Sequence, residues 1–444
     1  GKKSIEKLLE SIAMKEQFAD LFRLGDVAPL AETMLETLRQ HSDVLRVAIA
    51  GSYRRSKEIL HDLDFLVATS EPAKMTKFFT TLPEVHSVIA CGDTKAAIRL
   101  ENGLQCDLRA VSNDQFPFAL QYFSGSKEHN VALRSRALKY GWSLNEYGFT
   151  PKDKPSPAAP AVKEEADIYR ILELDRIPPE LRENMGEIEA AEVGEIPRLI
   201  ELENLRGTFH NHTTESDGKN SLEEMAEAAR DLGLQYLGIS DHSKSQFQAR
   251  GLQPDRLLRQ IDAIREINKQ WDDFQIFSGT EVDILKDGTL DFEDDLLDKL
   301  DYCVGSIHGS FQLSEKDQTA RIIRAMENPH ITMIGHLTGR LLLKRKGYEL
   351  NMEKIFDCAA ATGTIIELNC NPRRLDMDWR HWHRARDKGV LTSINPDAHD
   401  IAHLQYLAFG VRVARKGWLR KEDVLNTRTL EEVREFISAP KGNR

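Results

Sequence analysis

The sequence has few cysteines and no long apolar run. Among 444 residues there are five cysteines, and no two of them form a Cys-x-x-Cys pair, so a disulfide framework is not indicated and a reducing cytoplasm fits. No apolar run approaches the roughly 18 residues that a membrane-spanning helix needs, and no secretory signal is visible. We therefore expect a soluble, cytoplasmic protein of two or three domains, each large enough to bury a core.

The chain also lacks the positive charge that is typical of proteins that bind nucleic acids. Its formal net charge is −11, and because the charges of residues 1–150 balance, the whole surplus belongs to the C-terminal part. Lys127, Arg134, Arg136 and Lys139 nevertheless predict a local basic helix, and contacts to a phosphate backbone need only a local patch. The overall acidity weakens the case for a nucleic-acid partner and leaves it open.

What the sequence does have is a set of metal-binding side chains in its C-terminal half. Imidazole and carboxylate groups are ligands of Zn²⁺, Mn²⁺ and Fe²⁺, and a set of this size can hold about three such ions if one carboxylate bridges. The candidates are His210, His212, Asp217, His242, Glu281, His308, His336, Asp397 and His399.

Most of these residues directly follow short apolar runs that are typical of β-strands. A further run at 364–369 is followed by no obvious ligand, and amphipathic stretches at 221–232, 254–269 and 352–361 predict helices between the strands. Repeated alternation of strand and helix predicts a (β/α) barrel, in which strand ends converge on one face. The strands predicted before ligands are 205–209, 236–240, 275–280, 302–307, 331–335 and 391–396.

Each histidine has a plain alternative interpretation. A single histidine after a strand is often a hydrogen-bonded structural residue, but coincidence does not explain successive strand ends. His210 and His212 are separated by one residue, as are Asp397 and His399, and alternate residues of a strand point to the same side. Other histidines lack this placement and are interpreted as structural or surface residues, namely His330, His381, His383 and His403.

The motifs around these ligands resemble those of a known family. Phe-His-Asn-His-Thr-Thr-Glu-Ser-Asp-Gly at 209–218, Ser-Asp-His at 240–242 and Pro-Asp-Ala-His at 396–399 are similar to motifs of the polymerase and histidinol phosphatase (PHP) family of metal phosphoesterases. The resemblance implies a distorted (β/α)7 barrel over 204–444 with up to three Mn²⁺, Zn²⁺ or Fe²⁺ ions. It implies one ion on His210, His212, Glu281 and Asp397, a second on Glu281, His308 and His336, and a third on Asp217, His242 and His399. Arg340, Arg373 and Arg374 are candidates to neutralise a phosphate.

The first third of the chain carries a second group of acidic residues. Strands are predicted at 47–50, 61–67 and 104–111, and the last two carry Asp62, Asp64 and Asp107. Asp62 and Asp64 lie on one face because the strand period is two. Three carboxylates on neighbouring strands form a site for two hard divalent cations such as Mg²⁺ or Mn²⁺. This arrangement is typical of phosphoryl or nucleotidyl transfer.

A predicted turn at 51–55 precedes these strands. Gly51 allows the backbone to approach a triphosphate, while Ser52 and Arg55 supply a hydroxyl and a charge-assisted donor. The spacing of this Gly-Ser pair from the aspartates resembles the nucleotidyltransferase superfamily.

A third motif narrows this resemblance. Gln-Tyr-Phe-Ser-Gly-Ser-Lys-Glu-His-Asn at 121–130 resembles the Tyr-Phe-Thr-Gly-Ser segment of family X DNA polymerases, with Ser124 in the place of threonine. The resemblance implies an α+β polymerase palm at 41–110, a thumb at 111–150 and catalytic roles for the three aspartates. It also implies that Tyr122, Phe123 and Gly125 accommodate the deoxyribose, Asn130 the incoming nucleotide and Arg134 the template strand.

Together, the two halves resemble bacterial family X DNA polymerases in which a polymerase core precedes a PHP domain. A Pro-rich segment within 151–203 is expected to connect them. Residues 1–40 are predicted to form amphipathic helices, interpreted as the remainder of the fingers, and we expect the N-terminal lyase-like domain of the family to be missing.

The resemblance implies a DNA repair enzyme that fills gaps and has a metal-dependent 3′-5′ exonuclease or 3′-end phosphoesterase. It would act on gapped or primed DNA with dNTPs, as a monomer near the bacterial nucleoid. One alternative is a PHP-type phosphatase of a small phosphorylated metabolite with a non-catalytic nucleotide-binding module. A second alternative makes the metals purely structural.

Overall fold

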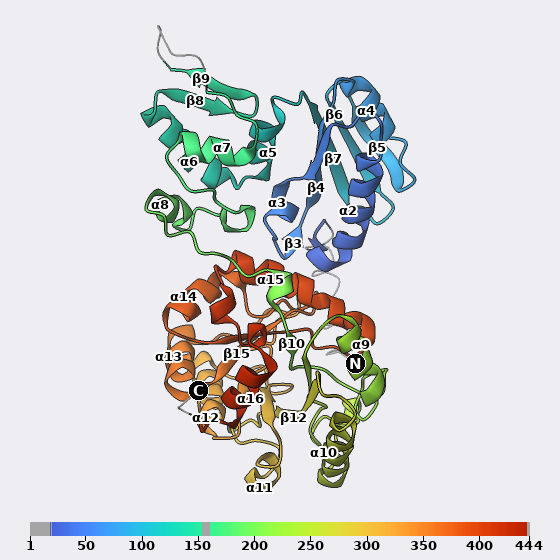
Figure 1. Cartoon of the computed structure of the whole chain (residues 1–444), viewed down its shortest axis with the longest axis vertical. Helices are drawn as coiled ribbons and strands as arrows, with labels where there is room; N and C mark the ends of the chain where they lie inside the picture. The colour runs from blue at the N-terminus through green and yellow to red at the C-terminus, as the bar shows by residue number, and fades with distance from the viewer. Residues whose placement is uncertain (1–17, 19, 153–159, 442–444) are drawn as a thin grey trace, which may run out of the picture. The chain divides into compact units, whose positions relative to one another are not determined.

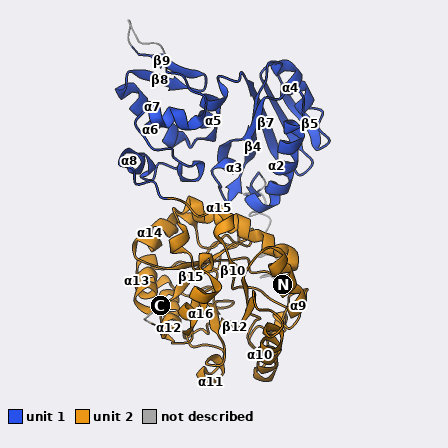
Figure 2. Ribbon diagram, viewed as in Figure 1, with its two compact units in different colours: residues 1–197 blue, residues 198–444 orange. Residues whose placement is uncertain are grey.

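A computed structural model describes residues 18, 20–152 and 160–441. The chain divides into two compact units, Gly1–Pro197 and Arg198–Arg444 (Figure 2). The predicted helices of residues 1–40 are described only in part: α2 (Leu24–Arg39) confirms one of them, and residues 1–17 lie outside the described residues. Among the described residues, no helix combines the length and apolar character needed to cross a membrane.

The part of the first unit predicted to be the palm is a five-stranded sheet. Its strand order is β2-β4-β7-β6-β5, and β4 pairs with β7 in parallel while the other pairs are antiparallel. Helix α2 packs near β2, with Val27, Ala31, Met34 and Leu38 buried along one side at helical spacing. The strands are β2 (Arg46–Ile49), β4 (Asp62–Ala68), β5 (Val85–Cys91), β6 (Lys95–Leu100) and β7 (Gln105–Val111), and helix α4 (Pro72–Phe79) packs near β7.

The three strands predicted in the palm are present, but the predicted turn at 51–55 is different. Gly51–Arg54 forms the short helix α3. The backbone N–H of Arg54 donates to Ala50 O at 3.1 Å and that of Arg55 to Gly51 O at 3.3 Å, which closes one helical turn. This turn follows β2 directly and lies beside β4.

The predicted thumb (111–150) and the segment after it consist of helices and a hairpin. Helix α6 begins at Ser126, whose hydroxyl accepts a hydrogen bond from the His129 N–H at 3.1 Å, as expected of an N-cap. The elements are α5 (Phe116–Ser124), α6 (Lys127–Lys139), β8 (Trp142–Asn145), β9 (Gly148–Pro151), α7 (Glu165–Ile171) and α8 (Glu187–Glu192).

The segment after the hairpin is largely structured. Arg182 is fully buried and pairs with Glu165 at 2.6 Å, and Glu165 also pairs with Arg54 of α3 at 2.7 Å. His129 Nδ1 lies 2.7 Å from a carboxylate oxygen of Glu187. The described residues from 160 to 197 therefore pack into the first unit and do not form an extended linker.

The second unit is a seven-stranded parallel barrel. The strand order follows the chain from β10 to β16, and a bridge between Asn211 and Ala398 brings the last strand beside the first. All seven strands predicted from the sequence are present: β10 (Gly207–Thr208), β11 (Tyr236–Ile239), β12 (Gln275–Asp283), β13 (Tyr302–Ser306), β14 (Met333–Ile334), β15 (Ile365–Asn369) and β16 (Thr392–Asn395).

Helices lie outside these strands (Figure 1). The three predicted helices are confirmed as α9 (Leu222–Asp231), α10 (Pro254–Asn268) and α13 (Met352–Thr362). Helix α9 begins with a capping box between Ser221 and Glu224. The other helices are α11 (Asp294–Leu297), α12 (Glu315–Glu327), α14 (Trp382–Asp387), α15 (Leu407–Lys416) and α16 (Leu430–Ser438).

Four buried aromatic residues fill the barrel below the candidate ligands. Phe209 packs on Tyr236, Phe277 and Tyr302, with ring centroids 5.4–6.0 Å apart. Glycine is required beside them, because a Cβ at Gly279 would lie 2.4 Å from the Tyr302 ring. These rings lie earlier on their strands than the ligands, so the polar cluster occupies the carboxyl ends of the strands.

Candidate metal centre and polymerase site

The candidate ligands of the barrel meet around one carboxylate. Glu281 is 1% exposed. It lies inside β12, where it pairs with Val304 of β13, and not after the end of the strand as the sequence predicted. Its carboxylate oxygens lie near a nitrogen of five histidines: His242 at 2.8 Å, His336 at 2.9 Å, His308 at 3.3 Å, His210 at 3.4 Å and His212 at 3.7 Å.

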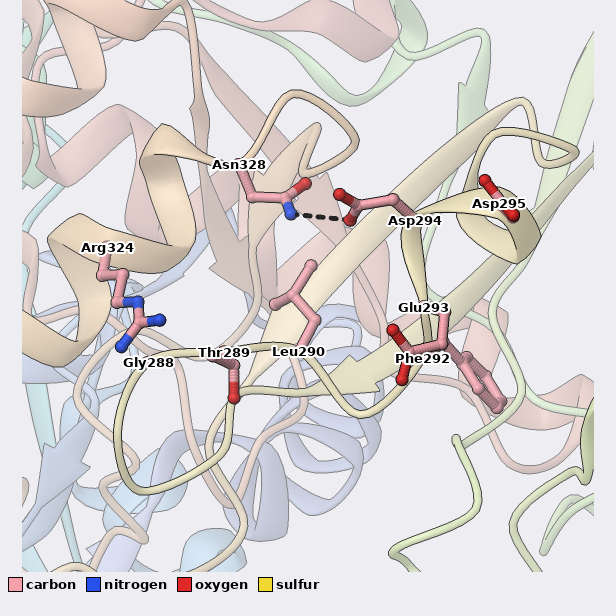
Figure 3. A pocket seen from close by; sticks show the side chains of 9 residues that line it. All are labelled: Gly288, Thr289, Leu290, Phe292, Glu293, Asp294, Asp295, Arg324 and Asn328. Atoms are coloured by element: carbon pink, nitrogen blue, oxygen red, sulfur yellow. Dashed lines mark hydrogen bonds between the residues drawn. The ribbon is translucent and has the colours of Figure 1, made fainter.

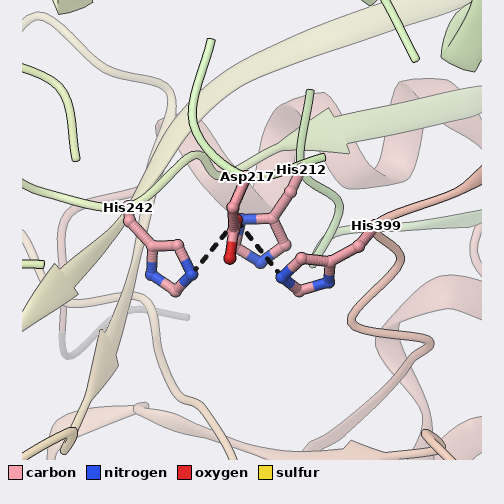
Figure 4. A group of neighbouring side chains, drawn as sticks. All are labelled: His212, Asp217, His242 and His399. Carbon is pink, nitrogen blue, oxygen red and sulfur yellow. Dashed lines mark ion pairs between the residues drawn. The ribbon is translucent and has the colours of Figure 1, made fainter. Parts of the chain in front are cut away.

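Two aspartates complete this cluster. Asp397 Oδ1 lies 3.4 Å from His212 Nε2 and 3.5 Å from His399 Nδ1. Asp217 Oδ1 lies 3.3 Å from His399 Nε2 and 3.5 Å from His242 Nε2 (Figure 4). All nine predicted ligands are thus brought together by the fold.

The grouping within the cluster differs in part from the one that the resemblance implies. Groups of donor atoms within 4.8 Å of one another are His212, Asp217, His242 and His399; His210, His212 and Asp397; and His242, Glu281 and His308. His212 and His242 therefore each join two groups, and His336 contacts Glu281 outside them. The assignment of residues to individual ions stays a prediction.

The chemistry of these donors fits metal ions. Within the described part of the chain, His210 Nε2, both ring nitrogens of His212 and His336 Nδ1 are buried without a hydrogen-bond partner. An unsatisfied buried polar atom costs roughly 1–3 kcal/mol, so several such atoms in one cluster indicate that metal ions bind to them. Burial and the neighbouring His399 and His242 lower the pKa of His212 to about 3, which keeps its ring neutral and able to coordinate.

Two further carboxylates, which the sequence reasoning missed, orient the ligands. Glu367 on β15 is fully buried, and its Oε1 lies 2.6 Å from His210 Nδ1. Asp283 Oδ1 lies 2.6 Å from His308 Nδ1. A usable signal was present in each case: Glu367 interrupts the apolar strand run at 365–368, and Asp283 follows Glu281 at strand spacing.

A third missed residue holds the loop that carries two ligands. Asp241 is fully buried and accepts hydrogen bonds from Thr213 N at 2.8 Å, Ser216 Oγ at 2.5 Å and Gln260 Nε2 at 2.5 Å. Asp217 follows directly on this loop. Asp241 therefore fixes the backbone between His212 and Asp217.

Replacing Glu367 with glutamine should weaken metal binding. The carboxylate also accepts hydrogen bonds from His336 N at 2.7 Å and Asn395 Nδ2 at 3.0 Å, and an amide cannot accept from all three neighbours. Loss of such an orienting partner typically lowers metal affinity by about 10–100-fold. Titration of the metal-free protein with Mn²⁺ by calorimetry measures this change, and unchanged affinity in a folded variant would refute the orienting role.

The arginines proposed near the barrel mouth have different surroundings. Arg374 Nε lies 3.5 Å from Asp397 Oδ2, at the edge of the cluster. Arg340 donates from Nε to Arg374 O at 2.9 Å and pairs with Asp378 at 3.2 Å. Arg373 is exposed. Of the three, Arg374 lies next to a candidate ligand.

The histidines interpreted as structural include one beside the cluster. His383 stacks on Trp418 with ring centroids 4.7 Å apart. His403 Nδ1 accepts a hydrogen bond from the backbone N–H of His399 at 3.2 Å, so it supports the loop of a candidate ligand. His330 and His381 belong to none of the candidate metal groups among the described residues.

The barrel also has a cavity of about 510 Å³ that is separate from these ligands. It is lined by residues 288–290, 292–295, 324 and 328, and Asp294 accepts a hydrogen bond from Asn328 at 3.1 Å (Figure 3). None of the nine candidate ligands lines it. Substitutions of its carboxylates can therefore serve as controls for substitutions of the candidate metal ligands.

The three aspartates of the palm form the second site. Asp64 on β4 and Asp107 on β7 are register partners in a parallel pair, and one oxygen each of Asp62, Asp64 and Asp107 lies within 4.8 Å of the others. Burial, together with Asp62 and Asp107, raises the pKa of Asp64 to about 7. Divalent cations would relieve this repulsion between like charges.

Comparison with known proteins decides the family. Residues 119–183 match the family model for the DNA polymerase beta thumb, and residues 208–371 match the PHP domain. The chain is 40% identical over 443 residues to the DNA polymerase/3′-5′ exonuclease PolX of Bacillus subtilis, which covers 98% of this chain and 76% of that protein. The chain belongs to the PolX family of DNA polymerases with a PHP domain.

Other relatives match shorter parts of the chain. A probable phosphatase of Thermoanaerobacter is 25% identical over 243 residues, 52% of this chain and 94% of that protein. A repair DNA polymerase X of African swine fever virus is 30% identical over 111 residues, 23% of this chain and 62% of that protein. A probable phosphatase and a repair DNA polymerase X are therefore each similar to part of this PolX-family chain.

Gly51 of the palm is required for a reason that the sequence did not reveal. Its φ is +60°, and a Cβ there would lie 2.1 Å from Asp64 Oδ2. Glycine thus allows helix α3 to begin directly against a candidate metal ligand.

Replacing Gly51 with alanine should therefore impair primer extension. The left-handed conformation costs a residue with a Cβ roughly 1–2 kcal/mol, and Asp64 must also move away. Gly103→Ala is the matched control, because Gly103 has a φ of +89° and nothing within 4 Å of an added Cβ. We expect both variants to melt at a slightly lower temperature and Gly51→Ala alone to lose extension, as measured on a labelled primer. Full extension by Gly51→Ala would show that Asp64 tolerates displacement.

The remaining predicted nucleotide and DNA contacts lie on helices α5 and α6. The rings of Tyr122 and Phe123 are partly exposed and meet edge to face at 5.2 Å. Asn130 is buried, and its side chain donates to Tyr122 O at 2.7 Å and accepts from Gln121 at 2.8 Å. Arg134 Nε donates to Asn130 O at 3.3 Å. Asn130 thus orders the backbone of the Tyr-Phe segment, and its contact with a nucleotide stays a prediction.

Proposed function

We propose that this PolX-family chain is a DNA repair enzyme with two active sites. Its palm and thumb carry out template-directed gap filling, and its barrel acts as a metal-dependent 3′-5′ exonuclease or 3′-end phosphoesterase. The observation that carries the proposal is the gathering of Asp62, Asp64 and Asp107 within 4.8 Å in a chain whose barrel also gathers all nine candidate ligands. The match to a polymerase and exonuclease over 98% of the chain supports it.

In the polymerase site, we assign Asp62, Asp64 and Asp107 to two Mg²⁺ or Mn²⁺ ions. Oxygen ligands on neighbouring strands suit such ions, which keep room for substrate phosphates. The triphosphate would meet Gly51, Ser52 and Arg55 at the start of α3. The thumb residues Tyr122, Phe123, Gly125 and Asn130 would then border the deoxyribose and base, with Arg134 on the template strand.

In the barrel, we assign the nine ligands to as many as three Mn²⁺, Zn²⁺ or Fe²⁺ ions. Bound divalent ions would polarise a phosphate ester and make water more acidic. The chain itself contributes a dry, anionic base for the ions, since Glu281 and Glu367 are buried. Arg374, next to Asp397, is placed to pair with a non-bridging phosphate oxygen.

A phosphatase of a small metabolite is the second candidate. The relatives named probable phosphatases match 52% of this chain, which supports phosphoester hydrolysis without favouring DNA. In that case the palm would bind nucleotide without catalysis. The close grouping of the three palm aspartates favours the polymerase, because a binding module has no need of two adjacent cations.

The proposed partners follow from these sites. They are gapped or primed DNA and dNTPs, with the protein acting as a monomer in the bacterial cytoplasm, at the nucleoid. Purely structural metals remain the plainest alternative for the barrel, and they predict no hydrolysis at all.

A labelled primer annealed at a gap tests both activities in one tube. With dNTPs and Mg²⁺ or Mn²⁺ we expect extension to the end of the gap, and without dNTPs we expect shortening from the 3′ end. p-Nitrophenyl phosphate serves as the small ester for comparison. If the protein hydrolyses the small ester but neither extends nor shortens the primer, the result would support the metabolite phosphatase and contradict the repair function.

A further inference from the structure

A carboxylate from the segment after the β8–β9 hairpin lies between two cations of the palm. Glu183 Oε1 is 3.1 Å from Arg55 Nε, and its Oε2 is 3.3 Å from Lys57 Nζ. Its side chain is 9% exposed. Arg55 caps helix α3 and Lys57 follows it, so Glu183 bridges the two cations next to the predicted triphosphate site.

The neighbouring arginine has a different partner. Arg54 forms a two-pronged ion pair with Glu165, with distances of 2.7 and 2.8 Å, and Glu165 is held in turn by Arg182. The segment after the hairpin therefore supplies one carboxylate for each arginine of the pair: Glu165 for Arg54 and Glu183 for Arg55.

A second contact fixes the other side of the Arg55 guanidinium. Its Nη1 donates to the backbone carbonyl of Ser124, and a Cβ added to Gly125 would lie 2.9 Å from that nitrogen. Arg55 is thus held between Glu183 and the Ser-Gly turn at the end of α5. Residues next to α3, at the end of α5 and in the segment after the hairpin thus meet at one side chain.

We infer that Glu183 is a positioning residue that sets Arg55 and Lys57 for the triphosphate of the incoming nucleotide. The inference rests on the proposed polymerase function and adds a residue to its substrate site. One carboxylate shared by two cations orients both and leaves the local charge positive, as a polyphosphate needs. Long cationic side chains lose rotamer freedom when they bind a phosphate. Glu183 restricts the conformations of Arg55 and Lys57 before the nucleotide binds, so less freedom is lost on binding.

The effect should fall on binding and not on the chemical step. The triphosphate contacts these cations in the ground state and in the transition state alike, and removal of such uniform binding raises KM without changing kcat. Loss of preorganisation at two side chains predicts a rise of about tenfold in KM for the dNTP.

The test uses the full chain and a one-nucleotide gap with Mg²⁺. Glu183→Ala should raise KM for the dNTP about tenfold with kcat within about twofold, and Glu183→Gln, which keeps an acceptor for Arg55, should fall between it and the wild type. Inorganic tripolyphosphate, as a competitive inhibitor, should lose affinity in parallel. Glu164→Gln is the matched control: Glu164 pairs with Arg46 at 2.6 Å in the same segment, and we expect its KM to be unchanged.

The outcomes separate this inference from the proposed function. If the wild type fails to extend a primer, the polymerase function falls. If the wild type extends and Glu183→Ala has a normal KM, only the role of Glu183 falls. A joint loss of kcat and melting temperature, with the affinity for tripolyphosphate unchanged, would make Glu183 a structural residue and would also overturn the inference.

Discussion

Asp64→Asn should abolish primer extension and leave shortening of the same primer intact. Asp64 lies on β4 opposite Asp107 and within 4.8 Å of both other palm carboxylates. The amide has the same shape but no charge, so it attracts a divalent cation far less. Divalent ions contribute several kcal/mol to stabilising charge in phosphoryl transfer, so we expect extension to fall by about 10³-fold.

An exposed aspartate of the same palm provides the control. Asp93 lies in the β5–β6 turn, and Asp93→Asn should extend primers at the normal rate. Gel-resolved products with and without dNTPs measure both activities, and thermal melting verifies that each variant is folded. An equal loss of extension and shortening in folded Asp64→Asn would contradict two separate sites.

The sequence predicted the barrel well because its strands are short, apolar and regularly spaced. Each run predicted one strand, and six of the seven runs were followed by a candidate ligand. All seven runs became strands, including 364–369, which had no obvious ligand after it. The ligand cluster followed from the same argument, because parallel strands in one barrel place their ends together.

Contacts between residues on different strands of the barrel could not be predicted from the sequence pattern. Glu367 was missed because its partner, His210, lies on a different strand, and nothing in the local pattern joins the two. Glu281 was placed after its strand, whereas β12 continues through it to Asp283, since β13 supplies hydrogen-bonding partners that a sequence does not show. The reason for Gly51 was also hidden, because the nearest atom to its missing side chain belongs to Asp64.

Glu281→Gln should have the reverse effect of Asp64→Asn. Five histidines surround the Glu281 carboxylate at 2.8–3.7 Å. Burial alone would lower the pKa of His308, but Glu281 and Asp283 raise it to about 10, which shows how strongly this charge governs its neighbours. Without this charge, the cluster lacks the carboxylate on which the five histidines converge. We therefore expect the amount of bound metal to fall and the rate of primer shortening to drop by about 10³-fold.

Metal content gives a readout for Glu281→Gln that does not depend on activity. After gel filtration in Mn²⁺, elemental mass spectrometry should measure less bound manganese per protein in Glu281→Gln than in the wild type. Asp294→Asn is the matched control, because Asp294 is a barrel carboxylate whose cavity contains no candidate ligand. Extension should survive in both variants, since the palm aspartates belong to the other compact unit. If folded Glu281→Gln keeps its metal and still shortens primers, the histidine cluster is not the nuclease site. Glu281 is the position that tests this most directly, because five of the other candidate ligands converge on its carboxylate.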